Sequence, residues 1–225
     1  MNYKIITDEA ILKDFIDWLP QCQPHEMYYC CLFARKKYAK DCEFLKGDKS
    51  QLKRFTSRKE FLFQKIKQLE CEVGSYQEKG NPIPQEALAL YISDNPRDLR
   101  IATEKSAMEL VRIGFSYQNQ NPHQIVMSAI QKANGKRHYA HFDFDGVDLD
   151  TTLELLEGKL NRTAIVPLMT RGGFHLLIDY SKIDPQYEKR WYSAVMKCPG
   201  RDQKGDNIMP VPGTHQGGFT PYLIK

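Results

Sequence analysis

Residues 139–145 read Tyr-Ala-His-Phe-Asp-Phe-Asp, an alternation that predicts a β-strand with two different faces. One face carries Tyr139, His141, Asp143 and Asp145, and the other carries Ala140, Phe142 and Phe144. Residues two apart on a strand are about 6–7 Å apart. Two ionised carboxylates at that spacing repel unless a divalent cation lies between them. We therefore expect a metal site at Asp143 and Asp145; the alternative is that a common Asp-x-Asp tripeptide merely ends the strand.

A second segment, residues 163–179, reads as a strand, a glycine turn and another strand. In a strand over residues 173–178, His175 shares a face with Gly173 and Leu177, away from the apolar side chains. We expect His175 on an open face; the alternative is a core histidine satisfied by one hydrogen bond. Gly172 and Gly173 would let a phosphate approach backbone N–H groups, with Arg171 and His175 holding its oxygens.

These segments resemble the catalytic core of the archaeo-eukaryotic primase superfamily, the primase-polymerases of plasmids, phages and mobile elements. The acidic pair of that family is matched by Phe142-Asp143-Phe144-Asp145, and its small-residue segment ending in His is matched by residues 170–175. A third acid completes the family's metal site. Asp206 is the candidate here, since it precedes Val211-Pro212-Gly213-Thr214, which is similar to the Pro-Gly-Thr segment of plasmid and phage members.

The resemblance implies a DNA primase or polymerase that joins nucleoside triphosphates on a single-stranded DNA template. It implies that Asp143, Asp145 and Asp206 are catalytic metal ligands, and that the nucleotide is bound by Arg171, Gly172, Gly173, His175 and Thr214. Nucleotidyl transfer needs an activated 3′-hydroxyl and neutralised phosphate charge, which two divalent ions on shared carboxylates supply. Oxygen ligands suit Mg²⁺ or Mn²⁺. Asp179 is the competing third acid, but it lies about 13 Å along the strand from His175, too far for one cluster.

Basic side chains gather in the first quarter of the chain, although the formal net charge is only +4. Arg35, Lys36 and Lys37 lie next to Tyr38, an arrangement suited to a phosphate backbone and stacked bases. Arg97 leaves the edge of a predicted strand, where it would reach a phosphate. We expect these four residues to bind nucleic acid; the alternative is an ordinary solvated surface.

Six cysteines without a Cys-x-x-Cys pair indicate free thiols in a reducing compartment. No apolar run approaches the 18 or so residues of a membrane span, and the first residues carry no apolar signal core. We therefore expect a cytoplasmic protein without a membrane partner. No Gly-x-x-x-x-Gly-Lys-Ser/Thr motif is present, so strand opening would require a separate helicase.

Periodicity and breaker residues predict an α+β fold, a mixed sheet backed by helices. Strands are expected at 27–34, 87–92, 139–145 and 173–178, and near Ile165. Helices are expected at 8–19, capped by Asp8, at 57–70, capped by Ser57, and at 99–113, 122–133, 149–159 and 184–196. Residues 1–85 are expected to form a helix-rich N-terminal part, and residues 86–225 the catalytic core. The resemblance implies that this core is an RNA-recognition-like sheet.

Two other function classes stay open beside metal-dependent nucleotidyl transfer. One is a catalytically inactive module that binds single-stranded nucleic acid, which intact Asp143, Asp145 and His175 argue against. The other is a metal-dependent nuclease or replication initiator. A relaxase-type initiator needs two His one residue apart, whereas His138 and His141 point to opposite faces of their strand.

Overall fold

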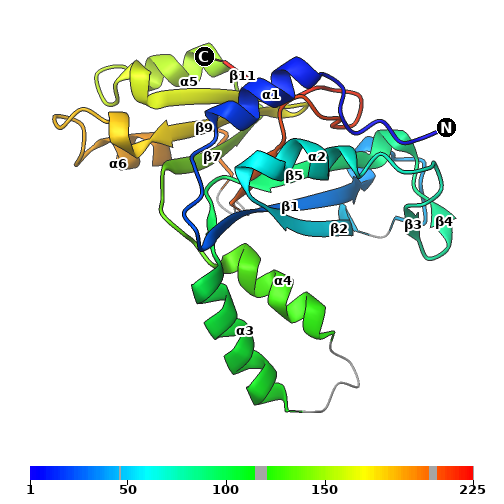
Figure 1. The fold of residues 1–225 in the computed structure, drawn as a ribbon. Helices are drawn as coiled ribbons and strands as arrows, with labels where there is room; N and C mark the ends of the chain where they lie inside the picture. Colours follow the sequence, from blue (N-terminus) through cyan, green and yellow to red (C-terminus); the bar gives the residue numbers. More distant parts are fainter. Residues whose placement is uncertain (46, 115–120, 203–206, 225) are drawn as a thin grey trace.

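Two antiparallel sheets lie next to each other in the computed structural model, which describes residues 1–45, 47–114, 121–202 and 207–224 (Figure 1). The helices are α1 (Glu9–Trp18), α2 (Leu62–Lys67), α3 (Leu99–Ile113), α4 (Pro122–Lys132), α5 (Leu149–Leu156) and α6 (Trp191–Met196). The strands are β1 (Glu26–Arg35), β2 (Lys49–Ser57), β3 (Gln77–Glu78), β4 (Asn81–Pro82), β5 (Leu88–Ser93), β6 (Arg97–Asp98), β7 (Tyr139–Asp145), β8 (Ile165–Met169), β9 (Gly173–Asp179), β10 (Ile208–Pro210) and β11 (Tyr222–Leu223). The α+β class predicted from the sequence is confirmed, but the expected mixed sheet is wrong, because the paired strands are antiparallel and form separate sheets.

The larger sheet has the strand order β10-β5-β1-β2, and β6 pairs with the beginning of β1. Its central strand β1 includes residues 27–34, where a strand was predicted, and it is apolar almost throughout and buried on both faces. One face packs against α1 and α2 through Leu12, Phe15 and Leu62. The opposite face packs against α4 through Met127 and Ile130.

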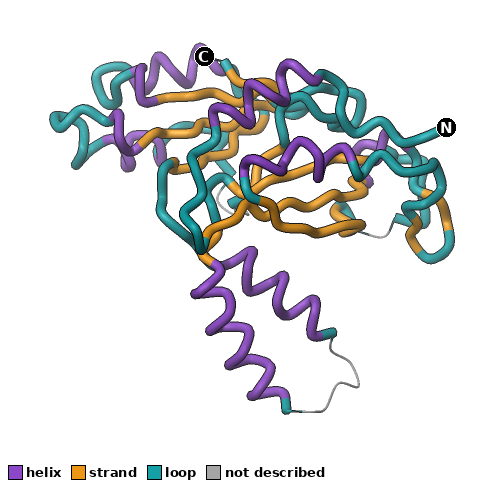
Figure 2. The backbone as a smooth tube through the Cα atoms, viewed as in Figure 1, coloured by secondary structure: helices purple, strands orange, loops and turns teal. Residues whose placement is uncertain are grey.

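The smaller sheet has the strand order β11-β8-β9-β7, with α5 and α6 packed on one face (Figure 2). Phe142, Phe144 and Phe174 point into that core, together with Leu156 of α5 and Trp191 of α6. The alternation predicted for residues 139–145 is therefore confirmed. The odd-numbered residues of β7 face the larger sheet.

The seam between the sheets is apolar at one end. Tyr139, at the start of β7, stacks on Trp18 of α1 with ring centroids 4.6 Å apart. Leu168 and Leu177 of the smaller sheet join the same core. This packing holds the sheets together, while the rest of the β7 face continues into a polar region.

The second edge of β7 is partly paired with a segment that follows α6. Asp145 N donates to Gly200 O at 3.0 Å, and Asp202 N donates to Asp143 O at 2.9 Å. Arg201 forms an antiparallel bridge with Phe144. Residues 200–202 therefore run antiparallel beside the end of β7 that carries the two acids.

Helices α3 and α4 form a hairpin that extends away from the sheets (Figure 1). Asp98 caps α3 by accepting from Arg100 N and Ile101 N, and Asn121 caps α4 immediately before Pro122. The helix predicted over 99–113 is confirmed residue for residue. In the described ranges, no helix has the length and apolar character needed to cross a membrane.

Three predictions about local structure require correction. Residues 1–85 contain not only α1 and α2 but also β1 and β2, and β1 pairs with β5 beyond residue 85, so this part is mixed rather than helix-rich. Ser57 ends β2 and does not cap a helix, because pairing with Tyr28 extends the strand to this residue. The helix expected over 184–196 begins only at Trp191.

Arg97 also differs from its prediction, since its residue surface is only 1% exposed. Its guanidinium donates to Asn134 Oδ1 and to Asn207 O, and lies 3.4 Å from Asp94 Oδ1. The side chain of Arg97 is therefore not accessible to nucleic acid, and the predicted contact is wrong. Arg97 instead neutralises the buried carboxylate of Asp94.

We expect Arg97→Met to lower the free energy of unfolding by about 3–5 kcal/mol, because it leaves a buried carboxylate unpaired. Adding Asp94→Asn should recover part of this loss. Arg100→Met is the matched control, since that arginine side chain is 70% exposed, and should cost much less. Denaturant unfolding measures all three, and equal losses for Arg97→Met and Arg100→Met would contradict the structural role of Arg97.

Candidate active site

The polar end of the seam is a cavity of about 250 Å³ between the two sheets. His141, Asp143 and Asp145 of β7 and His175 of β9 line one wall. The larger sheet and its loops supply the opposite wall, with Arg35, Lys37, Tyr38, Asp48, Lys49, Tyr91, Ile208 and Pro210. Thr170, Gly172, Asp202 and Gln216 complete the lining. The structure thus brings together Asp143 and Asp145 of the three predicted acids, the predicted histidine and two of the predicted basic residues.

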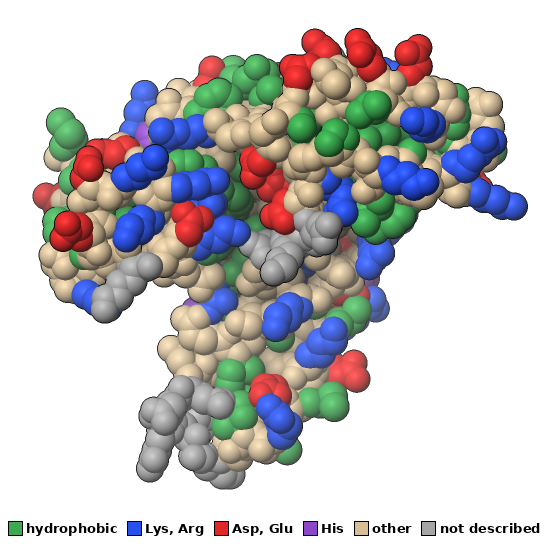
Figure 3. Space-filling view, turned by 180° about the vertical axis from the view of Figure 1, so that it is seen from behind, with side chains coloured by type: hydrophobic (Ala, Val, Ile, Leu, Met, Phe, Trp, Pro, Cys, Tyr) green, Lys and Arg blue, Asp and Glu red, His purple; other side chains and the backbone are tan. Residues whose placement is uncertain are grey.

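Charged side chains of both signs gather on the face of the molecule that Figure 3 draws. Figure 3 shows Asp and Glu side chains near the centre of the face, flanked on both sides by Lys and Arg side chains. A divalent cation favours the acids, whereas phosphate oxygens favour the surrounding cations. The face therefore has both signs of charge that a metal-bound polyphosphate requires.

His175 is 6% exposed and lies between the sheets, so the expectation of an open face is wrong. Its Nε2 is 3.1 Å from Asp143 Oδ1, and its Nδ1 is 2.6 Å from His141 Nε2. The two imidazole rings stack, with centroids 4.8 Å apart and planes inclined by 22°. The larger sheet covers the face of β9 that carries His175. The sequence of residues 173–178 alone does not indicate this covering.

The hydrogen-bonded pair of histidines continues to a buried ion pair. His141 Nδ1 lies 3.8 Å from Asp94 Oδ2, and Asp94 lies beside Arg97. Burial raises the pKa of Asp94 to about 6, although Arg97 acts in the opposite direction. Burial lowers the pKa of His141 to about 3, so this ring is neutral near pH 7. We call the chain Arg97, Asp94, His141, His175 and Asp143 the seam network.

Asp143 is held as a carboxylate. Burial alone would raise its pKa, but the hydrogen bond and charge of His175 hold it below the ordinary value. The charge of Lys37 adds to this effect. With its side chain 30% exposed in the cavity, Asp143 therefore presents a negative charge that a cation can reach.

The predicted basic residues divide into an anchored and an accessible group. Arg35 is buried, donates to the Tyr91 hydroxyl and pairs with Asp48 at 2.8 Å, so it is not a free nucleic-acid contact. Lys36 is half-buried and does not line the cavity. Lys37 lies at the cavity; burial and the nearby Arg35 lower its pKa, while Asp48, Asp145 and Asp143 oppose that shift.

Tyr38 organises the cations at this wall. The Arg171 guanidinium lies 4.8 Å from its ring centroid, the Lys37 ammonium lies at 5.3 Å and the Arg35 guanidinium at 5.6 Å. Such cation–π contacts fix otherwise flexible side chains. Arg171 N also donates to Gln216 Oε1 at 3.0 Å. The predicted Arg171 is thereby held close to the cavity.

The glycines before His175 are needed for close packing. A Cβ at Gly173 would lie 2.1 Å from Phe144 O, which no side chain tolerates. A Cβ at Gly172 would lie 3.3 Å from Asp145 Oδ1. The two residues let the turn pass directly beside the acidic end of β7.

Three further predicted residues have different outcomes. Thr214 is 1% exposed, donates its hydroxyl to Val211 O and does not line the cavity. Asp206 lies outside the described residues. Asp179 is separated from the acidic pair, as predicted, because it pairs with Tyr139 at the opposite end of β7 and accepts from Ser181 N.

Sequence reasoning missed Asp202, Asp94, Tyr91 and Gln216. Asp202 was visible in the same Arg-Asp-Gln-Lys-Gly-Asp segment as Asp206, four residues earlier. Asp94 follows a buried strand, which is a common position for functional carboxylates. Tyr91 and Gln216 come from distant parts of the chain, so no local pattern reported them.

The donor set suits a hard divalent cation. Asp143 and Asp145 offer carboxylate oxygens from one strand face, and Mg²⁺ takes only one or two protein carboxylates and keeps water or phosphate as further ligands. Within the ranges that the structure describes, no group of three or more His, Cys, Asp or Glu side chains is arranged to hold a metal ion.

Comparisons of the chain with protein-family models, with curated proteins and with solved structures found no match.

The seam network predicts how stability depends on pH. The pKa of His141 falls from an ordinary value of 6.5 to about 3, so its contribution to folding is complete above pH 6.5. That contribution is lost progressively as the pH falls from 6.5 towards 3. Lowering the pH from 7.5 to 5 should therefore reduce the free energy of unfolding less in His141→Gln than in the unmodified protein. Denaturant unfolding without added metal measures both.

His123→Gln is the control for this measurement, because His123 is exposed on α4. It should follow the unmodified protein at both pH values. The raised pKa of Asp94 acts in the opposite sense, since its contribution is lost as the pH rises through about 6. Parallel pH profiles for His141→Gln and the unmodified protein would contradict a neutral, buried His141.

Proposed function

We propose that this chain is a metal-dependent nucleotidyltransferase, a primase or polymerase that joins nucleoside triphosphates on a single-stranded DNA template. The observation that carries the proposal is the cavity in which Asp143 and Asp145 face a wall bearing Lys37 and Arg35. Carboxylates and cations on opposite walls suit a triphosphate bound together with divalent ions. The resemblance of the same residues to the archaeo-eukaryotic primases points to the same class.

The strand arrangement supports an RNA-recognition-like core. β7, α5 and β8 form a split β-α-β unit, with β9 antiparallel between the two strands. β9 leads to α6, and residues 200–202 then return to the free edge of β7. We propose that this irregular segment takes the place of the fourth strand of such a sheet.

Several residues of the cavity, and Arg171 beside it, have a role in this proposal. Mg²⁺ or Mn²⁺ bound by Asp143 and Asp145 would activate the attacking 3′-hydroxyl and neutralise charge on the phosphates. His175 orients the Asp143 carboxylate through Nε2, and a phosphate contact by His175 would require this hydrogen bond to be given up. Lys37 and Arg171 offer positive charge to the phosphates, and Arg35 holds Tyr91 and Asp48 in place. Opening of duplex DNA would come from a separate helicase.

Asp143→Asn and Asp145→Asn should each lower nucleotidyl transfer by about two orders of magnitude or more, because each removes a ligand charge at nearly constant volume. The assay is incorporation of labelled nucleotides with Mg²⁺ or Mn²⁺ and single-stranded DNA, with and without a primer. Asp150→Asn on α5 is the control, since Asp150 is an exposed acid in a first helical turn. Thermal unfolding should show that all three variants fold.

Full activity of either cavity variant would reject the metal-dependent mechanism. Cleavage of the DNA in place of extension, lost in the same two variants, would assign the cavity to a nuclease. Binding of DNA without any turnover would assign the chain to an inactive binding module.

Two residues compete for the role of third carboxylate. Asp206 is favoured by its position before the Pro-Gly-Thr segment, and Asp202 lines the cavity with its backbone bonded to Asp143. We expect Asp202→Asn to raise the Mg²⁺ concentration needed for half-maximal activity by about tenfold or more, which corresponds to the loss of one ligand or its orientation. A Mg²⁺ titration of Asp202→Asn and Asp206→Asn side by side decides between them. Loss of activity confined to Asp206→Asn would favour the motif spacing and reject Asp202.

A further inference from the structure

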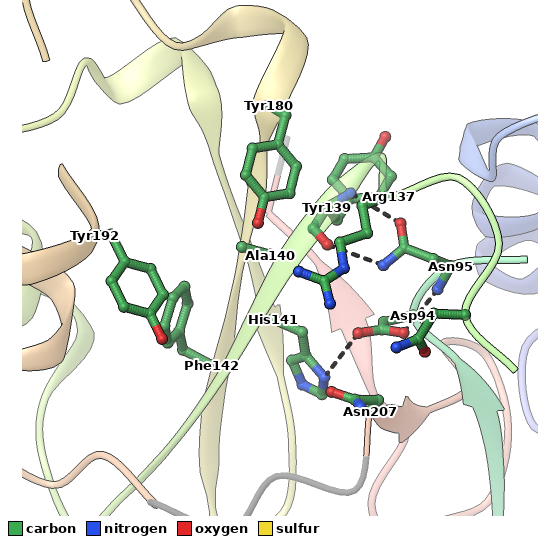
Figure 4. A pocket seen from close by; sticks show the side chains of 11 residues that line it. Asp94, Asn95, Arg137, Tyr139, Ala140, His141, Phe142, Tyr180, Tyr192 and Asn207 are labelled. Carbon is green, nitrogen blue, oxygen red and sulfur yellow. Dashed lines mark hydrogen bonds and ion pairs between the residues drawn. The ribbon is translucent and has the colours of Figure 1, made fainter. Parts of the chain in front are cut away.

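A second pocket, of about 190 Å³, adjoins the cavity and shares His141 with it as a common wall. Tyr180, which follows β9, and Tyr192 of α6 line one side of this pocket, and Arg137, which precedes β7, lines the other. Figure 4 shows both tyrosine rings directed inward, with the Arg137 guanidinium facing them. We call this site the tyrosine pocket.

Some polar groups that line the tyrosine pocket form hydrogen bonds within the protein, and others do not. Asn95 is fully engaged, because its side chain donates to Tyr139 O and accepts from the N–H groups of His138 and Tyr139. In contrast, no described residue forms a hydrogen bond or ion pair with the guanidinium of Arg137, or a hydrogen bond with the hydroxyls of Tyr180 and Tyr192. The engaged wall is structural, and the unpaired groups are available to a ligand.

The available groups define the chemistry of that ligand. Both rings contact Trp191 in T-shaped arrangements, and Tyr180 and Tyr192 remain 39% and 53% exposed, so part of each ring is accessible to a planar aromatic group. An unpaired guanidinium favours a phosphate, which it can bind through two parallel hydrogen bonds. A volume of 190 Å³ is that of about six water molecules, enough for one base and far too small for a longer segment, while the exposed Arg137 can hold the attached phosphate at the edge of the pocket.

From these features we propose that the tyrosine pocket binds one nucleotide unit of the single-stranded nucleic acid, with a base against the tyrosines and a phosphate at Arg137. This inference rests on the proposed function, because it assigns the template or primer strand to a site beside the catalytic cavity. The incoming triphosphate belongs to the cavity with Lys37 and the acidic pair, whereas the tyrosine pocket carries no comparable cluster of cations. The strand is therefore the ligand that fits the pocket.

Binding of a labelled single-stranded oligonucleotide, measured by fluorescence anisotropy in EDTA over a series of salt concentrations, tests this inference without requiring catalysis. Arg137→Gln should reduce affinity and lower the magnitude of the slope of log K against log salt by about 0.7, the value for one phosphate contact on a single strand. Tyr192→Leu should reduce affinity about threefold to tenfold with an unchanged slope, because stacking releases no counterion. Arg137→Lys should keep the slope, and Tyr192→Phe should keep the affinity.

Matched controls exclude general effects of charge and fold. Arg112→Gln removes an exposed arginine of α3, and Tyr222→Leu removes a 41% exposed tyrosine of β11, and neither lines the pocket. Both should bind as the unmodified protein does. Unchanged affinity and slope in Arg137→Gln and Tyr192→Leu would overturn the inference even if nucleotidyl transfer is found.

Kinetic constants separate this inference from the proposed function. If transfer occurs, the pocket variants should raise the KM for primed DNA and leave the KM for the nucleoside triphosphate unchanged. A raised nucleotide KM with unchanged DNA binding would assign the pocket to the incoming nucleotide and reject the inference. Pocket-dependent DNA binding by a protein without transfer activity would uphold the inference while rejecting the proposed function.

Discussion

Charge compensation within the seam between the two sheets is the constraint on which the rest of the site depends. Asp143 can be ionised there because His175 donates to it, and His175 is fixed in turn by His141. At the far end, Asp94 is balanced by Arg97. A buried ion pair is seldom more stable than well-packed apolar side chains of the same volume. The seam network is therefore better explained by the need to hold Asp143 in place than by stability.

The same strand both joins the sheets and carries the acids. Tyr139 packs on Trp18 at one end of β7, and Asp143 and Asp145 face the cavity at the other. Since side chains on one face of a strand repeat every two residues, a single run of seven residues supplies both functions. The apolar contacts at Tyr139 and Leu177 thereby set the separation of the two sheets, and with it the width of the cavity.

Local patterns in the sequence predicted the strands, and the strand faces, that carry the acidic pair and His175. The alternation of residues 139–145, the side of β9 on which His175 lies and the ends of α3 all follow from periodicity and capping, which are properties of neighbouring residues. The separation of Asp179 from the acids followed from the rise per residue, and the pairing of Asp179 with Tyr139 agrees with it. These features needed no knowledge of distant partners.

The errors concern contacts between distant segments. His175 and Arg97 are polar residues that the sequence placed in the open, but the larger sheet covers one and Asp94 and Asn134 enclose the other. The continuation of β2 to Ser57 depends on its pairing with β1, and the place of Asp202 depends on a return of the chain to β7 some 57 residues after Asp145. No periodic pattern encodes such pairings, because they form only when the whole sheet assembles.

The two neighbouring sites differ in chemistry, although His141 of a single strand borders both. Its ring belongs to the seam network and is neutral, so it adds no charge to either side. The cavity combines carboxylates with Lys37 and Arg35, whereas the tyrosine pocket combines aromatic faces with one unpaired guanidinium. A metal-bound triphosphate and a nucleotide of a strand differ in the same way, since the first carries concentrated negative charge and the second offers a base and a single phosphate. The neutral imidazole of His141 between them adds no charge of its own to either site.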